Sequence, residues 1–222
     1  MSRILIGIPT IDKVDASFMT SIMGMDFSDG NEYSYTTRCN SLIYNARGSM
    51  ATEAINEHYD YLCMLDSDMV MQRDTIRRLV EGVQGKHFLT ALYFRRRLPT
   101  GPLILKELDW YESEYGPMEI AETYEDYPRG EVFQIQGCGF GCCIMSVEMV
   151  RELGIAYRCN PWTPLPRLSE DFSFSFRAIK QGYKLYCDSS ILPLHAGVYL
   201  YGQHDWDRQR EDLRNGTDNK AD

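Results

Sequence analysis

Two acidic residues, Asp66 and Asp68, follow directly after the apolar run Tyr61–Leu65. Ending a strand needs a single turn residue, so a second acid two positions later needs a further explanation. In extended chain the two side chains point to the same side, and their charges repel unless a positive group lies between them. Hard carboxylate oxygens placed in this way suit Mg²⁺ or Mn²⁺. We therefore favour a divalent metal site over a plain turn in which Asp68 caps a helix.

Arg47 falls on the apolar stripe of a predicted helix, with Ile43, Met50 and Ala54 at helical spacing. An arginine on such a stripe is expected to be partly buried and to need an anionic partner. That partner is either an internal Asp or Glu or a ligand phosphate held by the guanidinium group. The spacing alone favours the internal carboxylate.

Glu170 and Asp171 follow Ser169, which can cap a helix whose first turn would then hold both acids. The alternative is that one carboxylate acts as a general base beside a reacting hydroxyl. Capping is the better reading of these residues in isolation. His195 ends another apolar run, where it is either a structural residue or a metal or phosphate ligand.

The segment Gly137–Cys143 is rich in glycine and cysteine. It is not a Walker loop, because no Gly-Lys-Ser/Thr follows, and it lacks the paired cysteines of a zinc site. Gly137 and Gly139 allow backbone to approach a ligand closely, and the cysteines are most simply packed strand residues. The basic run Arg95–Arg97 is either solvated or faces an anion.

Alternating strand and helix signals must position these residues, and they predict a mainly parallel sheet covered on both faces. In such sheets ligands collect at the carboxyl ends of the strands, where Asp66 and Asp68 lie. After Arg97 the pattern changes to loops with short strands. The predicted strands are 3–9, 33–37, 61–65, 87–94, 142–146, 184–187 and 191–194, and the predicted helices are 16–25, 41–59, 73–82, 147–153 and 169–181.

Composition places the chain among ordinary globular proteins, with 222 residues, 44% hydrophobic and 25% charged residues. The net charge of −9 argues against a protein that lives by non-specific binding to phosphate backbones. Seven cysteines without a C-x-x-C pair, and the lack of a signal peptide or of a long apolar run, predict a cytoplasmic protein with reduced thiols and no membrane span.

The order of these motifs resembles the small glycosyltransferases of the GT-A fold, close to the family-two-like enzymes of bacteria and phages. The resemblance covers roughly residues 3 to 200. Its motifs are specific when taken together, although no single motif is. The matching segments are ILIGIPT, NARGSMATEA, DYLCMLDSDM, GCGFGCCIMS, SEDFSFSFRAIKQGYKLYCD and LHAG. One departure is that relatives often read Ala-Arg-Asn where this chain has Ala46-Arg47-Gly48.

The resemblance implies roles for particular residues. Asp66 and Asp68 would hold the metal on a diphosphate, with Asp68 the direct ligand and His195 a further one. Asp171 would be the catalytic base, with Glu170 as the next choice. Pro9 and Thr10 would lie against the nucleoside, and the remaining donor-binding candidates are Arg47, Ser67, Gly137 and Gly139.

The resemblance also implies an α/β fold, a GT-A (Rossmann-like) three-layer sandwich with a mainly parallel mixed sheet. Residues 1–201 would form one domain, with a nucleotide-sugar half at about 1–97 and an acceptor half at about 98–201, followed by a polar, frayed tail at 202–222. The expected donor is a nucleotide-sugar, by analogy a UDP-sugar, used with Mn²⁺ or Mg²⁺. The acceptor would be a glycan, a lipid-linked sugar, a protein or a modified nucleobase.

Two other functions compete with this interpretation. A sugar-1-phosphate nucleotidylyltransferase is also α/β and metal-dependent, but such enzymes carry a glycine-rich phosphate-binding signature where this chain reads PTIDKVD. A non-catalytic domain that binds a sugar-nucleotide or a glycan would not need both acidic motifs. Metal-dependent release of nucleotide from a donor separates the candidates.

Overall fold

The structure is a computed structural model that describes residues 1–197 and 200–218. Strands and helices alternate in its first ninety residues, as the sequence predicts. The helices are α1 (Ala16–Met23), α2 (Ile43–Asn56), α3 (Thr75–Gly82), α4 (Val147–Tyr157), α5 (Glu170–Lys180) and α6 (Gln203–Asp218). The strands are β1 (Arg3–Pro9), β2 (Glu32–Arg38), β3 (Tyr61–Leu65), β4 (Met69–Val70), β5 (Phe88–Ala91), β6 (Ile104–Ser113), β7 (Gly116–Thr123), β8 (Val132–Ile135), β9 (Gly137–Cys138), β10 (Cys142–Ser146), β11 (Leu185–Asp188), β12 (Leu194–Ala196) and β13 (Leu200–Tyr201).

Seven strands form the central sheet, in the order β2-β1-β3-β10-β5-β11-β8. β1 is parallel to β2 and β3, and β5 is parallel to β11. β10 runs antiparallel to both β3 and β5, and β8 runs antiparallel to β11. Five of the seven strands therefore point in one direction, which confirms the predicted mainly parallel mixed sheet.

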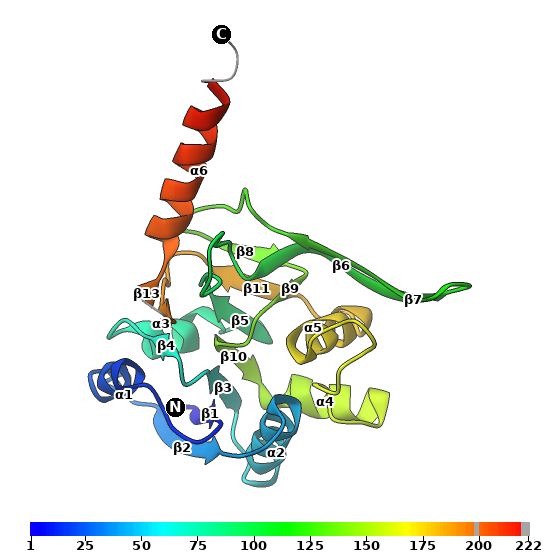
Figure 1. Cartoon of the computed structure of the whole chain (residues 1–222). Helices are drawn as coiled ribbons and strands as arrows, with labels where there is room; N and C mark the ends of the chain where they lie inside the picture. The colour runs from blue at the N-terminus through cyan, green and yellow to red at the C-terminus, as the bar shows by residue number, and fades with distance from the viewer. Residues whose placement is uncertain (198–199, 219–222) are drawn as a thin grey trace.

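Helices cover both faces of this sheet, which makes three layers (Figure 1). Successive residues of β1 enter different cores, because side chains alternate along a strand. Ile4 and Ile6 pack in the core that α1 and α3 cover, whereas Leu5 packs in the core that includes Met50 of α2 and Val150 of α4. The chain thus has the predicted α/β, Rossmann-like three-layer fold.

The β6–β7 hairpin is a difference from the predicted loops with short strands. β6 has ten residues, pairs with β7 along its length, and projects from the body of the molecule (Figure 1). Most of β7 is exposed, so its sequence lacks the apolar alternation that marks a half-buried strand. Exposed large side chains on the hairpin include Tyr111, Tyr115, Met118 and Ile120.

Two expectations near the carboxyl end of the chain are corrected. The strand predicted at 191–194 is wrong, because the ladder forms at β12 (Leu194–Ala196), after Pro193, which cannot donate a ladder hydrogen bond. The stretch predicted as a frayed tail contains the helix α6, which buries Trp206 to 4% exposure. No helix in the described part of the chain is long and apolar enough to cross a bilayer.

Candidate active site

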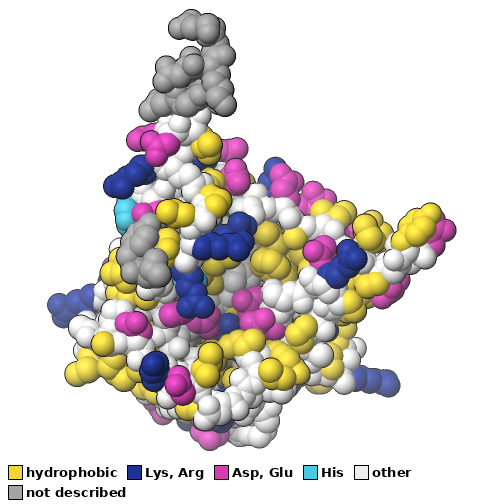
Figure 2. All heavy atoms as spheres, viewed as in Figure 1, with side chains coloured by type: hydrophobic (Ala, Val, Ile, Leu, Met, Phe, Trp, Pro, Cys, Tyr) yellow, Lys and Arg dark blue, Asp and Glu magenta, His cyan; other side chains and the backbone are white. Residues whose placement is uncertain are grey.

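The carboxyl ends of β1 and β3 open onto a hollow of about 330 Å³. Pro9 and Thr10 line it from the end of β1, and Asp66, Ser67 and Asp68 line it from the end of β3. The start of α2 contributes apolar surface through Leu42, Ile43 and Ala46. Figure 2 shows acidic and basic side chains gathered close together near the middle of the face in view. The structure therefore brings five of the predicted site residues to one hollow.

Asp66 and Asp68 reach this hollow from a turn, not from extended chain. The Met69 N–H donates to the Asp66 carbonyl at 3.1 Å, which closes the turn through Ser67. The expectation that both carboxylates share one projection is wrong, since the turn rotates them apart. Asp66 faces Arg47, and Asp68 faces His195 and Arg96.

Arg47 is only 1% exposed and lies among three partly buried acidic side chains. Its Nη2 lies 3.1 Å from Asp66 Oδ1 and 3.8 Å from Glu170 Oε1, and its Nε lies 3.4 Å from Asp171 Oδ1. The partners of Arg47 are thus internal carboxylates, the alternative that its helical spacing favours. Arg47 on α2 ties the end of β3 to the start of α5 in this way.

Asp171 combines burial with several charged neighbours. Burial raises the pKa of Asp171 to about 8, and the negative charges of Glu170 and Asp66 act in the same direction. Arg47 and the Phe140 N–H, which donates to Asp171 Oδ2 at 3.1 Å, oppose this rise. The predicted cap is confirmed, because the Ser169 side chain accepts from the Phe172 N–H at the start of α5. The capping Ser169 and the partly buried Asp171 therefore coexist at the start of α5.

Asp68 lies against two cationic or potentially cationic groups. His195 Nε2 is 3.4 Å from Asp68 Oδ2, and the Arg96 guanidinium contacts the same oxygen. Burial raises the pKa of Asp68, but the contacts with His195 and Arg96 outweigh it and leave the pKa below its ordinary value. Asp68 is therefore held as a carboxylate.

The orientation of His195 bears on whether a metal fits here. Its Nδ1 lies 2.8 Å from the Phe94 carbonyl, and because a carbonyl only accepts, Nδ1 carries the proton. In the neutral ring, the lone pair of Nε2 then faces an anionic oxygen of Asp68. Such a contact needs a proton or a cation between the two atoms, and a backbone carbonyl on the other nitrogen is the usual way to orient a ligating histidine.

The described residues contain no group of three or more His, Cys, Asp or Glu side chains arranged to hold a metal ion. Mg²⁺-type sites often take only one or two carboxylates and complete their shell with water and substrate phosphates. Asp68 and His195 fit that pattern as a two-residue donor set. Asp66, which is turned toward Arg47, does not join them in this arrangement.

Gly137 and Gly139, predicted to approach a ligand, do not line the hollow. A Cβ at Gly137 would lie 3.1–3.2 Å from Leu108 and Leu105, and a Cβ at Gly139 would overlap the Tyr93 hydroxyl. Tyr93 in turn accepts a hydrogen bond from the Gly141 N–H at 2.8 Å. The clash with Tyr93 is enough to require glycine at position 139, whereas a Cβ at position 137 would make tight contacts with the ends of two leucine side chains.

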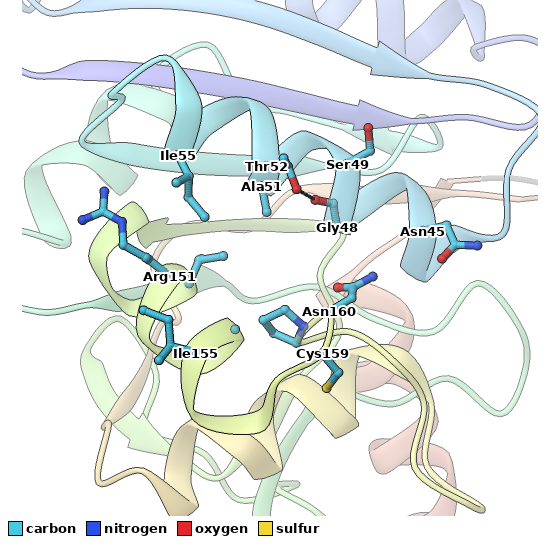
Figure 3. Close-up of a pocket in the computed structure, with 13 residues that line it drawn as sticks. Asn45, Gly48, Ser49, Ala51, Thr52, Ile55, Arg151, Ile155, Cys159 and Asn160 are labelled. Carbon is cyan, nitrogen blue, oxygen red and sulfur yellow. Dashed lines mark hydrogen bonds between the residues drawn. The ribbon is translucent and has the colours of Figure 1, made fainter.

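A larger hollow of about 560 Å³ lies between α2 and α4, lined by residues that include Asn45, Gly48, Arg151 and Asn160 (Figure 3). Neither member of the Asp66 and Asp68 pair lines it. Asn160 donates to the Tyr44 carbonyl at 2.7 Å and accepts from the Trp162 N–H at 3.1 Å. This hollow contains a structural link between α2 and the loop after α4, and none of the predicted site residues lines it.

Gly48 is required by that link. A Cβ at position 48 would lie 2.8 Å or less from the side-chain atoms of Asn160, which two hydrogen bonds hold in place. Gly48→Ala should therefore lower the free energy of unfolding by up to about 2 kcal/mol, since overpacking costs about 1–3 kcal/mol and helix propensity returns about 1 kcal/mol. In an Asn160→Ala background the same change should become neutral or stabilising in urea unfolding. An equal loss in both backgrounds would contradict this explanation.

Sequence reasoning missed the roles of two residues near the site. Arg96 belongs to a run of three arginines, and nothing in the run distinguishes the one that contacts Asp68. Tyr93 lies just beyond β5, where its buried ring supports the turn at Gly139–Gly141. The one signal for Tyr93 in the sequence is its position near the end of a predicted strand. That signal is weak, because an apolar run gives no reason to single out one tyrosine.

Comparison with known proteins supports the fold. The chain is similar to the crystal structure of A197 from STIV, with a TM-score of 0.59, 19% sequence identity, and coverage of 88% of this chain and 86% of that chain. No protein-family model matches the chain. No curated protein sequence matches it either. The likeness at this identity establishes a shared fold over most of both chains.

Proposed function

We propose that this protein is a metal-dependent glycosyltransferase that moves a sugar from a nucleotide-diphosphate sugar, by analogy a UDP-sugar, to an acceptor hydroxyl. One observation carries the proposal: Asp68 and His195 face each other beside a hollow at the strand ends, while Asp171 and Glu170 approach the same region through Arg47. The Rossmann-like fold and the motif order that resembles GT-A enzymes agree with this proposal.

Asp68 and His195 would hold Mn²⁺ or Mg²⁺ on the donor's diphosphate, where a divalent cation stabilises the negative charge that grows on the leaving group. Pro9 and Thr10 would contact the nucleoside, since they line the same hollow as Asp68. Arg47 would fix the positions of Asp66, Glu170 and Asp171 without touching the donor, because it is buried behind them.

Asp171 would act as the base in an inverting transfer. The acceptor oxygen attacks the anomeric carbon, the bond from that carbon to the diphosphate oxygen breaks with its electron pair leaving on the diphosphate, and the hydroxyl proton passes to Asp171. A carboxylate with a pKa of about 8 is well placed for this step, because general bases work best when their pKa lies near the operating pH.

Metal-dependent nucleotide binding is the first test. UDP with Mn²⁺ at ~100 times its dissociation constant should stabilise the protein by about 2.7 kcal/mol, seen as a rise in Tm. Asp68→Asn should lose most of that gain, because the amide cannot replace an anionic ligand. Nucleotide release from a panel of UDP-sugars with Mn²⁺ then identifies the donor.

A matched control is Asp109→Asn, which removes a surface carboxylate that pairs with Lys180 at 3.0 Å and does not line the hollow. It should keep the full Tm rise with UDP and Mn²⁺. A rise that is as large in Asp68→Asn as in the control would count against Asp68 as a metal ligand.

A further inference from the structure

Arg96 supplies an exposed positive charge at the rim of the candidate site. Its guanidinium contacts Asp68 Oδ2, the same oxygen that faces His195 Nε2 at 3.4 Å. The Arg96 side chain is 57% exposed, whereas those of Asp68 and His195 are 28% and 13% exposed. Arg96 thus approaches from the solvent side the carboxylate oxygen that a cation bound between Asp68 and His195 would need.

The backbone around Arg96 is firmly held, although the side chain is exposed. The Arg95 N–H donates to the Gly101 carbonyl at 2.9 Å, and the Thr100 hydroxyl donates to the Arg95 carbonyl at 2.8 Å. The same loop is also bonded to α6, because the Thr100 N–H donates to Gln209 Oε1 at 2.8 Å. A Cβ at Gly197 would lie 3.3 Å from Arg96 Cβ, so the chain just after β12 also lies close to this loop.

A fixed backbone with a long, exposed side chain lets the guanidinium exchange partners without moving the loop. The acidic character of the site explains why a mobile positive charge would be useful there. Four carboxylates (Asp66, Asp68, Glu170 and Asp171) gather there, and three of them share the buried Arg47. A diphosphate that approached this cluster would meet mainly negative charge, and a guanidinium binds phosphate oxygens well because its donors form a planar fork.

We propose that Arg96 is an internal counter-cation that exchanges partners: it holds Asp68 while the site is free of ligand, and it binds the donor's diphosphate once a divalent cation occupies Asp68 and His195. This inference rests on the proposed function. Arg96 therefore competes with the metal ion and cooperates with the diphosphate, so its removal has opposite effects on the two ligands.

The test measures those two affinities separately, at low salt, for wild type, Arg96→Gln and Arg97→Gln. Arg97 is the matched control, since it is the adjacent exposed arginine of the same run. Mn²⁺ binding without nucleotide is followed by the electron paramagnetic resonance signal of free Mn²⁺. Binding of inorganic diphosphate at saturating Mn²⁺ is followed by calorimetry.

Arg96→Gln should bind Mn²⁺ about two- to fivefold more tightly, as expected from the loss of a partly exposed ion pair. The same variant should bind diphosphate about tenfold more weakly or worse, because a charged hydrogen-bonding partner is lost. Arg97→Gln should match wild type in both measurements. Unchanged affinities in Arg96→Gln, or a change of the same sign for both ligands, would overturn the exchange.

Asp68→Asn separates this inference from the proposed function. If Asp68→Asn loses Mn²⁺ binding while Arg96→Gln behaves like wild type, the metal assignment stands and the role of Arg96 is rejected. If Asp68→Asn binds Mn²⁺ as wild type does, the metal assignment itself is wrong, and the exchange at Arg96 falls with it.

Discussion

Replacing Asp171 by Asn should lower the rate of sugar transfer by about 10² to 10⁴-fold, the usual contribution of a general base. Asn has a similar shape and keeps an oxygen that can accept the Phe140 N–H bond, which Asp171 accepts at 3.1 Å. It cannot take the proton of an acceptor hydroxyl. Donor binding should persist, since that is assigned to the hollow at Asp68. The measurement is transfer to an identified acceptor, alongside UDP affinity, for both proteins.

The stability of Asp171→Asn provides an independent check with a definite sign. The folded pKa of Asp171, about 8, lies above the ordinary value of 3.8. The folded state therefore retains a proton that the unfolded chain releases, so stability from this group is present at low pH and is lost as pH rises from about 4 to 8. Asp171→Asn should lack this decline and be at least as stable as wild type at pH 8.

The outcome for Asp171 has a clear alternative. If transfer by Asp171→Asn stays within a few-fold of wild type, Asp171 is a structural partner of Arg47 and Glu170 becomes the next candidate for the base. Glu170 lies 3.8 Å from Arg47 and its side chain is 17% exposed, so it shares the cluster while facing the same region.

Arg47→Met should be the most destabilising of these substitutions, with a loss of about 3–5 kcal/mol in the free energy of unfolding. The change removes the cation from a 1% exposed position and leaves Asp66, Glu170 and Asp171 close together without it. Urea unfolding at pH 7 measures the loss. Because the cause is the loss of the cation that the remaining carboxylates share, the loss should shrink in the double variant with Glu170→Gln.

The control for Arg47 is Arg38→Met. Arg38 also pairs with a glutamate, Glu53, but its side chain is 34% exposed. An exposed pair of this kind contributes only about 0–1 kcal/mol. If Arg47→Met costs no more than Arg38→Met, the buried cluster is not held together by Arg47, and its role in positioning Asp171 would have to be abandoned.

The sequence predicted the elements that carry a strong local signal. β1 and β3 were found at their observed bounds, because strands buried on both faces are continuous apolar runs. The same signal placed Asp66 and Asp68 at a strand end and so predicted where the hollow lies. The sequence does not predict the β6–β7 hairpin, because the largely exposed β7 has neither a continuous apolar run nor a clear alternation of apolar and polar residues.

The details of the site were harder to predict, since they depend on contacts between distant segments. The turn at Ser67 sends Asp66 toward Arg47 and Asp68 toward His195, and a local pattern cannot specify that divergence. The contact from Arg96 depends on a loop held against α6. The buried Trp206 and the hydrogen bonds between Gln209 and Thr100 position α6 against the rest of the protein. Neither contact can be predicted from the polar composition of this segment.

The bond between Gln209 and the Arg96 loop has a consequence for how this sequence can drift over evolutionary time. Gln209 accepts from the Thr100 N–H and also faces the Thr100 carbonyl with its Nε2, at 3.3 Å. A carboxamide of this length satisfies both backbone groups at once; a glutamate cannot donate, and an asparagine is one methylene shorter. We therefore expect selection for the loop to retain glutamine at position 209, although the surrounding sequence of α6 gives this position the look of ordinary polar surface.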